Sequence, residues 1–219
     1  MSEELKRKAA LEALSEIRDG MIVGLGTGST ASMFIQELAR SRMKVAGIPT
    51  SEQSRRLAEE LGVPLTTLKD HPVIDVTVDG ADEVSPRLDL IKGLGGALVR
   101  EKIVARASKR VVIVVDESKL VERLGTKTVI PVEVVPFAAP LILRQLQPGS
   151  LRVRNGQPIV TDNGNLIVDW QHGPIDNPSA LDTQLKSTTG VIDSGIFADI
   201  ASCVIAALRD GIRRIERNK

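Results

Sequence analysis

Residues 20–127 repeat one pattern: a short apolar run, a polar or glycine-containing tip, and then a helical segment. The apolar runs are rich in β-branched residues, which favours buried strands. Strands joined by crossover helices run parallel in one sheet, so this part predicts a doubly wound α/β fold. The predicted strands are 21–25, 45–48, 62–68, 73–78 and 110–115, and the predicted helices are 3–18, 31–41, 53–61 and 97–107.

The pattern changes at about residue 128. Predicted strands at 129–135, 151–154, 163–169 and 190–197 alternate with helices at 139–147 and 178–186. This βαββαβ order is typical of a small ferredoxin-like α+β domain. The runs 203–208 and 212–215 then predict two strands that return to the first sheet. The sequence therefore predicts a catalytic domain of 1–127 plus 203–219, with residues 128–202 inserted as a second domain.

Composition excludes several classes of function. Lys and Arg number 29 against 28 Asp and Glu, and aromatic residues make up only 2%. Such a chain offers neither a basic surface nor stacking platforms, so we expect no nucleic-acid partner. Cys203 is the single cysteine, no signal-peptide pattern opens the sequence, and no apolar run reaches about 18 residues. We therefore expect a cytoplasmic protein without disulfides and without a membrane partner.

The stretch Gly26-Thr-Gly-Ser-Thr30 follows the first predicted strand and precedes a helix. Free N–H groups, hydroxyl donors and the positive end of a helix dipole would meet there, which predicts an anion site at Thr27, Gly28, Ser29 and Thr30. A dinucleotide fingerprint would need glycine at position 29, and a Walker A loop would need a lysine. The sequence therefore favours a single phosphomonoester, with a capped turn without ligand as the alternative.

A second cluster lies at 78–102, where Asp79, Asp82, Lys92 and Glu101 occur close together. The carboxyl ends of parallel strands form the ligand crevice of such a sheet, and both aspartates follow the strand 73–78. The glycine-rich turn at 93–96 can bring backbone N–H groups to a ligand. Each residue alone is more typical of an ordinary turn or a solvated loop, but their crowding favours a site. Thr50 or Ser51 is expected to cap the next helix and could face the same crevice.

Seven motifs, in order and spacing, resemble the type A ribose-5-phosphate isomerases. They are Gly24-Leu-Gly-Thr-Gly-Ser-Thr-Ala31, Val78-Asp-Gly-Ala-Asp-Glu83, Ile91-Lys-Gly93, Arg100-Glu-Lys-Ile103, Asp116-Glu-Ser-Lys119, Pro131-Val-Glu-Val134 and Thr161-Asp-Asn-Gly-Asn165. The resemblance implies a Rossmann-like domain with an inserted α+β domain. It also implies interconversion of D-ribose 5-phosphate and D-ribulose 5-phosphate in the non-oxidative pentose phosphate pathway, without cofactor or metal, in a homodimer or homotetramer.

The resemblance also implies roles for individual residues. Glu101 matches the carboxylate that transfers the proton, and residues 27–30 match the phosphate loop. The positions that line the sugar are Asp79, Gly80, Ala81, Asp82, Lys92, Gly93, Leu94 and Gly95, and Lys119 matches a lysine that contacts substrate. Lys6 is a weaker match to a second such lysine. Leu94 stands where many members carry glycine, and residues 205–211 match the family less closely.

These residues suit proton transfer through an enediolate. Glu101 can act as the base, and Lys92 with the N–H groups of the turn can stabilise an oxyanion by about 3 kcal/mol per donor. Asp79 or Asp82 can assist ring opening, and the sequence does not decide between them. Metal-assisted hydride transfer would need a ligand cluster, which His71 and His172 do not supply. A phosphosugar-sensing regulator would need an added DNA-binding unit, and a coenzyme A transferase would use Glu101 as a nucleophile.

Overall fold

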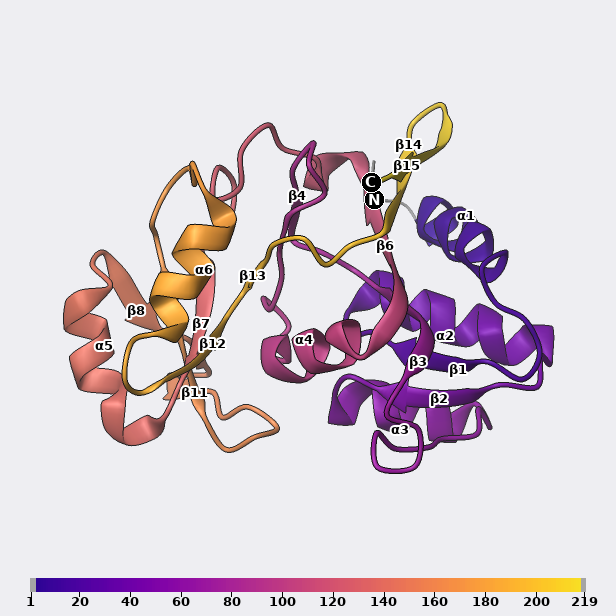
Figure 1. Cartoon of the computed structure of the whole chain (residues 1–219), viewed down its shortest axis with the longest axis horizontal. Helices are drawn as coiled ribbons and strands as arrows, with labels where there is room; N and C mark the ends of the chain where they lie inside the picture. Colours follow the sequence, from indigo (N-terminus) through magenta and orange to yellow (C-terminus); the bar gives the residue numbers. More distant parts are fainter. Residues whose placement is uncertain (1–2, 218–219) are drawn as a thin grey trace. The chain divides into compact units, whose positions relative to one another are not determined.

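The computed structural model describes residues 3–217, and the chain divides into two compact units (Figure 1). Unit 1 comprises Met1–Ala81, Arg100–Lys119 and Ile200–Lys219, and unit 2 comprises Asp82–Val99 and Leu120–Asp199. The predicted domain boundaries differ from this division, because residues 82–99 and 120–127 belong to unit 2. Residues 1, 2, 218 and 219 of the predicted first domain lie outside the described residues.

Unit 1 is built on a six-stranded sheet in the order β15-β14-β6-β3-β1-β2. Its strands are β1 (Ile22–Leu25), β2 (Ala46–Pro49), β3 (Ile74–Asp79), β6 (Ser108–Asp116), β14 (Cys203–Leu208) and β15 (Gly211–Glu216). All neighbours pair in parallel except β15, which forms an antiparallel hairpin with β14. The predicted parallel sheet, and the return of the C-terminal strands to it, are confirmed.

Helices cover both faces of this sheet. They are α1 (Glu3–Leu14), α2 (Ser29–Ser41), α3 (Glu52–Glu60) and α4 (Leu98–Arg106). Helix α1 packs beside α2 (Figure 1), and Ala9 and Phe34 of these helices share one apolar core with Val112 and Cys203 of the sheet. On the opposite face, Val104 of α4 packs with core residues of β2 and β3. This two-sided covering is the doubly wound arrangement that the sequence predicts.

The predicted strand at 62–68 is wrong. This segment makes one isolated bridge, between Leu65 and Gly47 of β2. Gly62 has a φ of +73°, outside the range of a strand, and Pro64 has no N–H group with which to extend a ladder. The segment therefore contacts the edge of the sheet without adding a strand to it.

Unit 2 contains a four-stranded antiparallel sheet in the order β12-β7-β11-β8. Its elements run β7 (Ile130–Val134), η2 (Pro136–Ala138), α5 (Ala139–Gln145), β8 (Gly149–Leu151), β9 (Val153–Arg154), β10 (Gln157–Pro158), β11 (Leu166–Trp170), α6 (Pro178–Lys186) and β12 (Val191–Ser194). Val132 and Val168 of the sheet pack against Ile142 of α5 and Leu185 of α6. The predicted βαββαβ order is present, although the predicted strand 151–154 divides into the end of β8 and the short β9.

The predicted strand 190–197 also divides, at Gly195. Strand β12 ends before it, and β13 (Ile196–Phe197) joins a second sheet of unit 2 with β4 (Glu83–Val84) and β5 (Leu90–Ile91). A Cβ at Gly195 would lie 2.3 Å from the carbonyl oxygen of Lys92, so only glycine allows the chain to change sheets here. This sheet also explains why residues 82–99 belong to unit 2.

Residues 120–127 are attached to unit 2 through the buried carboxylate of Glu83. Its Oε2 accepts a hydrogen bond from the backbone N–H of Gly125, and its Oε1 accepts from those of Lys127 and Thr128, each at 2.6 Å. Three charge-assisted bonds offset the cost of burying this carboxylate. Within residues 3–217, no helix has both the length and the apolar character needed to cross a membrane.

An ion-pair network in unit 1 ties the end of α1 to the sheet. Glu16 accepts hydrogen bonds from Arg110 of β6, at 2.8 Å, and from Arg214 of β15, and Arg110 also pairs with Glu216 at 2.9 Å. Burial opposes the charged form of Glu16, but the hydrogen bonds from Arg110 and Arg214 outweigh it. The pKa of this carboxyl therefore lies below its ordinary value of 4.5.

We expect Glu16→Gln to lower the free energy of unfolding at neutral pH by about 1 kcal/mol, because the charged partners lose a carboxylate. A carboxyl with a lowered pKa stabilises the fold above the pKa of the unfolded chain, and this stabilisation is lost as the pH falls through the folded-state value. The difference between wild type and variant should therefore shrink below about pH 4.5. Urea unfolding over a pH series measures it.

Glu12→Gln is the matched control, because Glu12 is an exposed carboxylate 4.0 Å from Arg214. It should change the stability much less than Glu16→Gln. Equal stability of wild type and Glu16→Gln at neutral pH, or a difference that grows in acid, would contradict the assignment.

Candidate active site

The predicted phosphate loop lies between β1 and α2 in unit 1. Gly28 is the N-cap residue of α2, with a φ of +102°, and it has no side chain to occupy the helix N-terminus. The Oγ1 of Thr27 lies 2.8 Å from that of Thr50 and donates to the Oγ of Ser51 at 2.8 Å. Ser51 also caps α3, as predicted. Three hydroxyl groups and uncapped N–H groups thus gather at one helix N-terminus, which suits a phosphate.

Asp79 lies against this loop. It is the last residue of β3, only 1% exposed, and its Oδ1 accepts hydrogen bonds from the N–H groups of Thr27, at 3.0 Å, and Gly80, at 2.7 Å. A Cβ at Gly26 would lie 2.3 Å from the same Oδ1, so the glycine makes room for the carboxylate. The tips of β1 and β3 are therefore joined through one side chain.

Lys6 of α1 adds a cation to the loop. Its Nζ donates to the Oγ of Ser29, the first residue of α2, at 3.0 Å. The neighbouring Arg7 donates to the buried Glu37 of α2 at 2.9 Å. The residue with the weakest family match, Lys6, thus places a positive charge beside the predicted phosphate loop.

Glu101 lies in the first turn of α4 and is 3% exposed. The preceding residue, Arg100, donates to Glu52 at 3.1 Å, and Glu52 directly follows Ser51, which accepts from Thr27. A chain of contacts therefore connects the start of α4 to the phosphate loop within unit 1.

Lys119 ends the short helix η1 (Glu117–Lys119), just beyond the carboxyl end of β6. Strand β6 pairs with β3, whose last residue is Asp79. Gly80 and Ala81 follow directly and are half-buried. Apart from Glu101 in α4, the predicted site residues of unit 1 thus lie at or just beyond the carboxyl ends of β1, β3 and β6, as expected for this sheet.

The predicted site residues of unit 2 are Asp82, Lys92 and the glycine-rich turn. Lys92 is 3% exposed; its backbone N–H donates to the carbonyl of Gly195 at 2.9 Å, and its Nζ lies 5.6 Å from the ring centroid of Phe197. The Oδ2 of Asp82 accepts from the N–H of Leu94 at 3.0 Å. An aromatic face and a fixed backbone hold the ammonium group in a largely water-free setting.

The turn itself needs glycine at two positions. Gly93 and Gly96 have φ values of +102° and +88°, whereas Leu94 has no positive φ, which explains why leucine is accepted there. The N–H of Gly96 donates to the carbonyl of Gly93 at 3.0 Å. In the described part of the chain, the turn's N–H groups without a protein acceptor are therefore those of Gly93 and Gly95.

Two family motifs meet elsewhere in unit 2. The Oε1 of Glu133, in β7, accepts from the Oγ1 of Thr161 at 3.0 Å and from the side-chain amides of Asn163, at 3.0 Å, and Asn165, at 2.8 Å. These contacts fasten the 161–165 turn to the sheet, so both motifs have a structural explanation.

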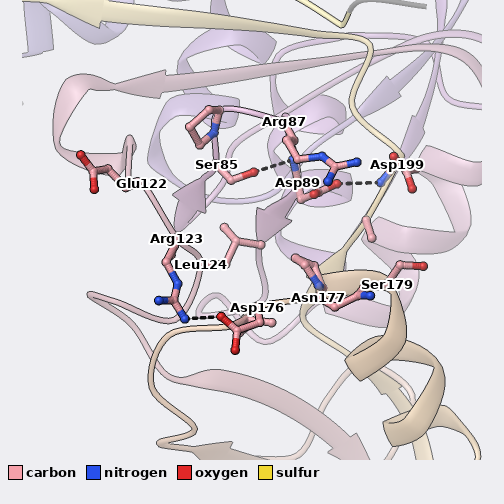
Figure 2. Close-up of a pocket in the computed structure, with 14 residues that line it drawn as sticks. Ser85, Arg87, Asp89, Glu122, Arg123, Leu124, Asp176, Asn177, Ser179 and Asp199 are labelled. Carbon is pink, nitrogen blue, oxygen red and sulfur yellow. Dashed lines mark hydrogen bonds and ion pairs between the residues drawn. The ribbon is translucent and has the colours of Figure 1, made fainter.

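A pocket of about 390 Å³ in unit 2 has a lining different from the predicted site (Figure 2). Arg123 pairs there with Asp176 at 2.5 Å, and Asp89 accepts from the backbone N–H of Asp199 at 3.0 Å. One ion pair and one hydrogen bond to the backbone thus engage three of its charged side chains. Among residues 3–217, no group of three or more His, Cys, Asp or Glu side chains could hold a metal ion.

Arg152 and Asp169 are not among the site residues that the sequence predicts, although they support the glycine-rich turn. The Nη1 of Arg152 donates to the carbonyl oxygens of Gly93, at 2.6 Å, and Leu94, at 2.9 Å, and the same guanidinium pairs with Asp169. Arg152 lies 59 positions from Gly93 and 58 positions from Leu94 in the sequence. No local motif connects them, so only the fold reveals the contact.

Comparisons with known proteins agree with this arrangement. Residues 46–211 match the model of the family described as ribose 5-phosphate isomerase A (phosphoriboisomerase A). The ribose-5-phosphate isomerase A of Roseiflexus castenholzii is 48% identical, covering 96% of this chain and 94% of the relative, and that of Thermococcus kodakarensis is 45% identical, covering 98% and 99%.

Two solved structures share the fold. A D-ribose-5-phosphate isomerase in complex with phospho-erythronic acid superimposes with a TM-score of 0.96 at 44% identity, covering 99% of this chain and 100% of the other. The ribose 5-phosphate isomerase A of Methanocaldococcus jannaschii gives 0.93 at 40% identity, with coverage of 99% and 100%. This chain therefore belongs to the ribose 5-phosphate isomerase A family.

Proposed function

We propose that this chain interconverts D-ribose 5-phosphate and D-ribulose 5-phosphate through an enediolate, with Glu101 carrying the proton between C1 and C2. The observation that carries the proposal is the buried Glu101 at the start of α4, linked through Arg100 and Glu52 to the loop at residues 27–30. Isomerisation of ribose 5-phosphate is the activity of the family. One carboxylate can remove the proton from one carbon and return it to the next.

The phosphate binds at residues 27–30, with Lys6 beside it. The uncapped N-terminus of α2 supplies N–H donors, and Lys6 supplies a positive charge. Binding of the phosphate fixes the far end of the sugar, so its interaction energy orients the reacting carbons. Lys119, at the carboxyl end of β6, contacts the substrate as well.

We propose that Lys92 and the N–H groups of Gly93 and Gly95 stabilise the developing oxyanion. The two glycine donors have no protein acceptor in the described residues, which leaves them available to a ligand. Asp79, Gly80, Ala81 and Asp82 contact sugar hydroxyls, and one of the two aspartates assists ring opening. No step of this mechanism calls on a cofactor or a metal.

The relative solved with phospho-erythronic acid suggests an inhibitor for this chain. That compound carries a phosphate at one end and a carboxylate at the other. A carboxylate places two negatively charged oxygens on one carbon, much as an enediolate concentrates charge on adjacent oxygens. We therefore include phospho-erythronic acid among the ligands of the proposed site.

We expect Glu101→Gln to lower kcat by at least about a thousandfold, because the amide cannot accept the proton. Binding of ribose 5-phosphate should persist, since the phosphate loop is unchanged. Coupled detection of ribulose 5-phosphate in the presence of EDTA measures turnover, and calorimetry measures binding. Glu60→Gln, an exposed carboxylate at the end of α3, is the control and should keep full activity. Near-normal turnover of Glu101→Gln would show that Glu101 does not transfer the proton.

Substitutions of Asp79 can separate two properties of its side chain: its negative charge and its ability to accept hydrogen bonds from backbone N–H groups. Asparagine keeps an oxygen for the N–H groups of Thr27 and Gly80, whereas alanine leaves both without this acceptor. We expect inorganic phosphate to inhibit Asp79→Asn within about threefold of wild type, and Asp79→Ala about tenfold more weakly, because the loop loses its support. Competitive inhibition constants measure this. Equal phosphate inhibition of wild type and Asp79→Ala would show that the loop does not depend on Asp79.

We also propose that the chain is cytoplasmic and forms a homodimer or homotetramer, as the family resemblance implies. Phe137 is 97% exposed in unit 2, and Val135, Leu141 and Ile192 are exposed apolar residues of β7–α5 and β12, which supports a surface covered in an assembly. Sedimentation velocity should show a dimer or tetramer in wild type and a smaller species in Phe137→Asp. A monomeric wild type would overturn the assembly proposal.

A further inference from the structure

The glycine-rich turn is held from one side by a single side chain. Arg152 lies between β8 and β9, is 12% exposed, and donates through Nη1 to the carbonyl oxygens of Gly93 and Leu94. These are consecutive carbonyl groups of the turn. The same glycine-rich turn carries the N–H groups of Gly93 and Gly95, which are the two donors of the proposed mechanism.

Asp169 of β11 fixes the orientation of this guanidinium. Its Oδ2 accepts from the Nε of Arg152 at 2.9 Å, and its Oδ1 accepts from Nη2. A carboxylate that binds Nε and Nη2 together, along one edge of the planar guanidinium, leaves it little rotational freedom. The backbone of Arg152 is fixed as well, because its N–H donates to the carbonyl of Ile167 and its carbonyl accepts from Ile159. Arg152 is therefore a rigid support.

Peptide geometry turns this support into a directional effect. In a trans peptide unit the carbonyl and the following N–H point in opposite directions. The bond from Arg152 to the carbonyl of Gly93 thus directs the N–H of Leu94 away from the guanidinium, where it meets Asp82. The bond to the carbonyl of Leu94 directs the N–H of Gly95 away from the guanidinium in the same manner.

The charge of Arg152 also makes the Gly95 N–H a stronger hydrogen-bond donor. A cation that hydrogen-bonds a carbonyl oxygen polarises the peptide unit and makes its N–H more positive. Oxyanion donors are effective when they are already oriented before the charge develops. Both effects act on the Gly95 N–H, which has no protein acceptor in the described residues.

We propose that Arg152, oriented by Asp169, is a positioning residue that aims and polarises the Gly95 N–H toward the oxyanion of the enediolate. The proposal rests on the proposed function and concerns the oxyanion end of the substrate alone. The phosphate loop belongs to unit 1 and has its own supports in Asp79 and Lys6. Loss of Arg152 should therefore affect the chemical step and leave phosphate binding unchanged.

The test compares Arg152→Met with Arg154→Met, a substitution of an exposed arginine two residues further along, in β9. We expect Arg152→Met to lower kcat by roughly ten- to a hundredfold with KM within about threefold of wild type, and Arg154→Met to match wild type. Arg152→Lys, which can reach one carbonyl, should recover part of the lost kcat. Asp169→Asn should give a kcat between those of wild type and Arg152→Met.

Two inhibitors separate this role from a general loosening of the fold. Inhibition by phospho-erythronic acid, which has an anionic group at the sugar-acid end, should weaken about tenfold in Arg152→Met, while inhibition by inorganic phosphate stays unchanged. Equal weakening of both inhibitors, or a kcat of Arg152→Met within about twofold of wild type, would overturn the inference. An inactive wild type would instead overturn the proposed function, so the two failures are distinguishable.

Discussion

The carboxylate of Asp79, bonded to the N–H groups of Thr27 and Gly80, is the contact on which the candidate site depends. It joins the tips of β1 and β3, and it fits only because residue 26 is glycine. The same contact sets the course of the chain into α2 and thus the direction of its N-terminal N–H groups. A buried carboxylate without such donors would be costly, so the loop at residues 27–30 and the aspartate stabilise one another.

Unit 2 uses the opposite arrangement, in which a cation holds carbonyl groups. Arg152 and Asp169 form a nearly buried pair, and the Nη1 of the guanidinium donates to two carbonyl groups of the glycine-rich turn. Such a pair adds little stability by itself, because desolvation offsets most of the attraction between the charges. Its physical effect is to fix the directions of successive peptide units. Rigid supports of this kind keep donors in place before charge develops on the substrate.

Local periodicity predicted most of the elements, and the errors have specific causes. The strand expected at 62–68 fails because Pro64 lacks an N–H group and Gly62 has a positive φ. The strand expected at 190–197 divides at Gly195, where a close backbone approach moves the chain into another sheet. Residues 120–127 lie with unit 2, where Glu83 binds backbone N–H groups more than 40 residues away. Single-sequence patterns carry no information about such distant partners.

The sequence by itself determined the parallel sheet and the βαββαβ order, and it predicted a phosphate loop at residues 27–30 and chemical roles for Glu101 and Lys92. These features follow from short-range patterns: strand and helix periodicity, glycine and hydroxyl residues at a helix start, and motif spacing. Only the tertiary structure decided that Lys6 reaches Ser29 and that Arg152 holds the carbonyl groups of Gly93 and Leu94. It also decided that two N–H groups of the turn have no acceptor among residues 3–217. The reason is physical: hydrogen bonds between residues distant in sequence depend on how strands pair and pack, which local residue patterns do not encode.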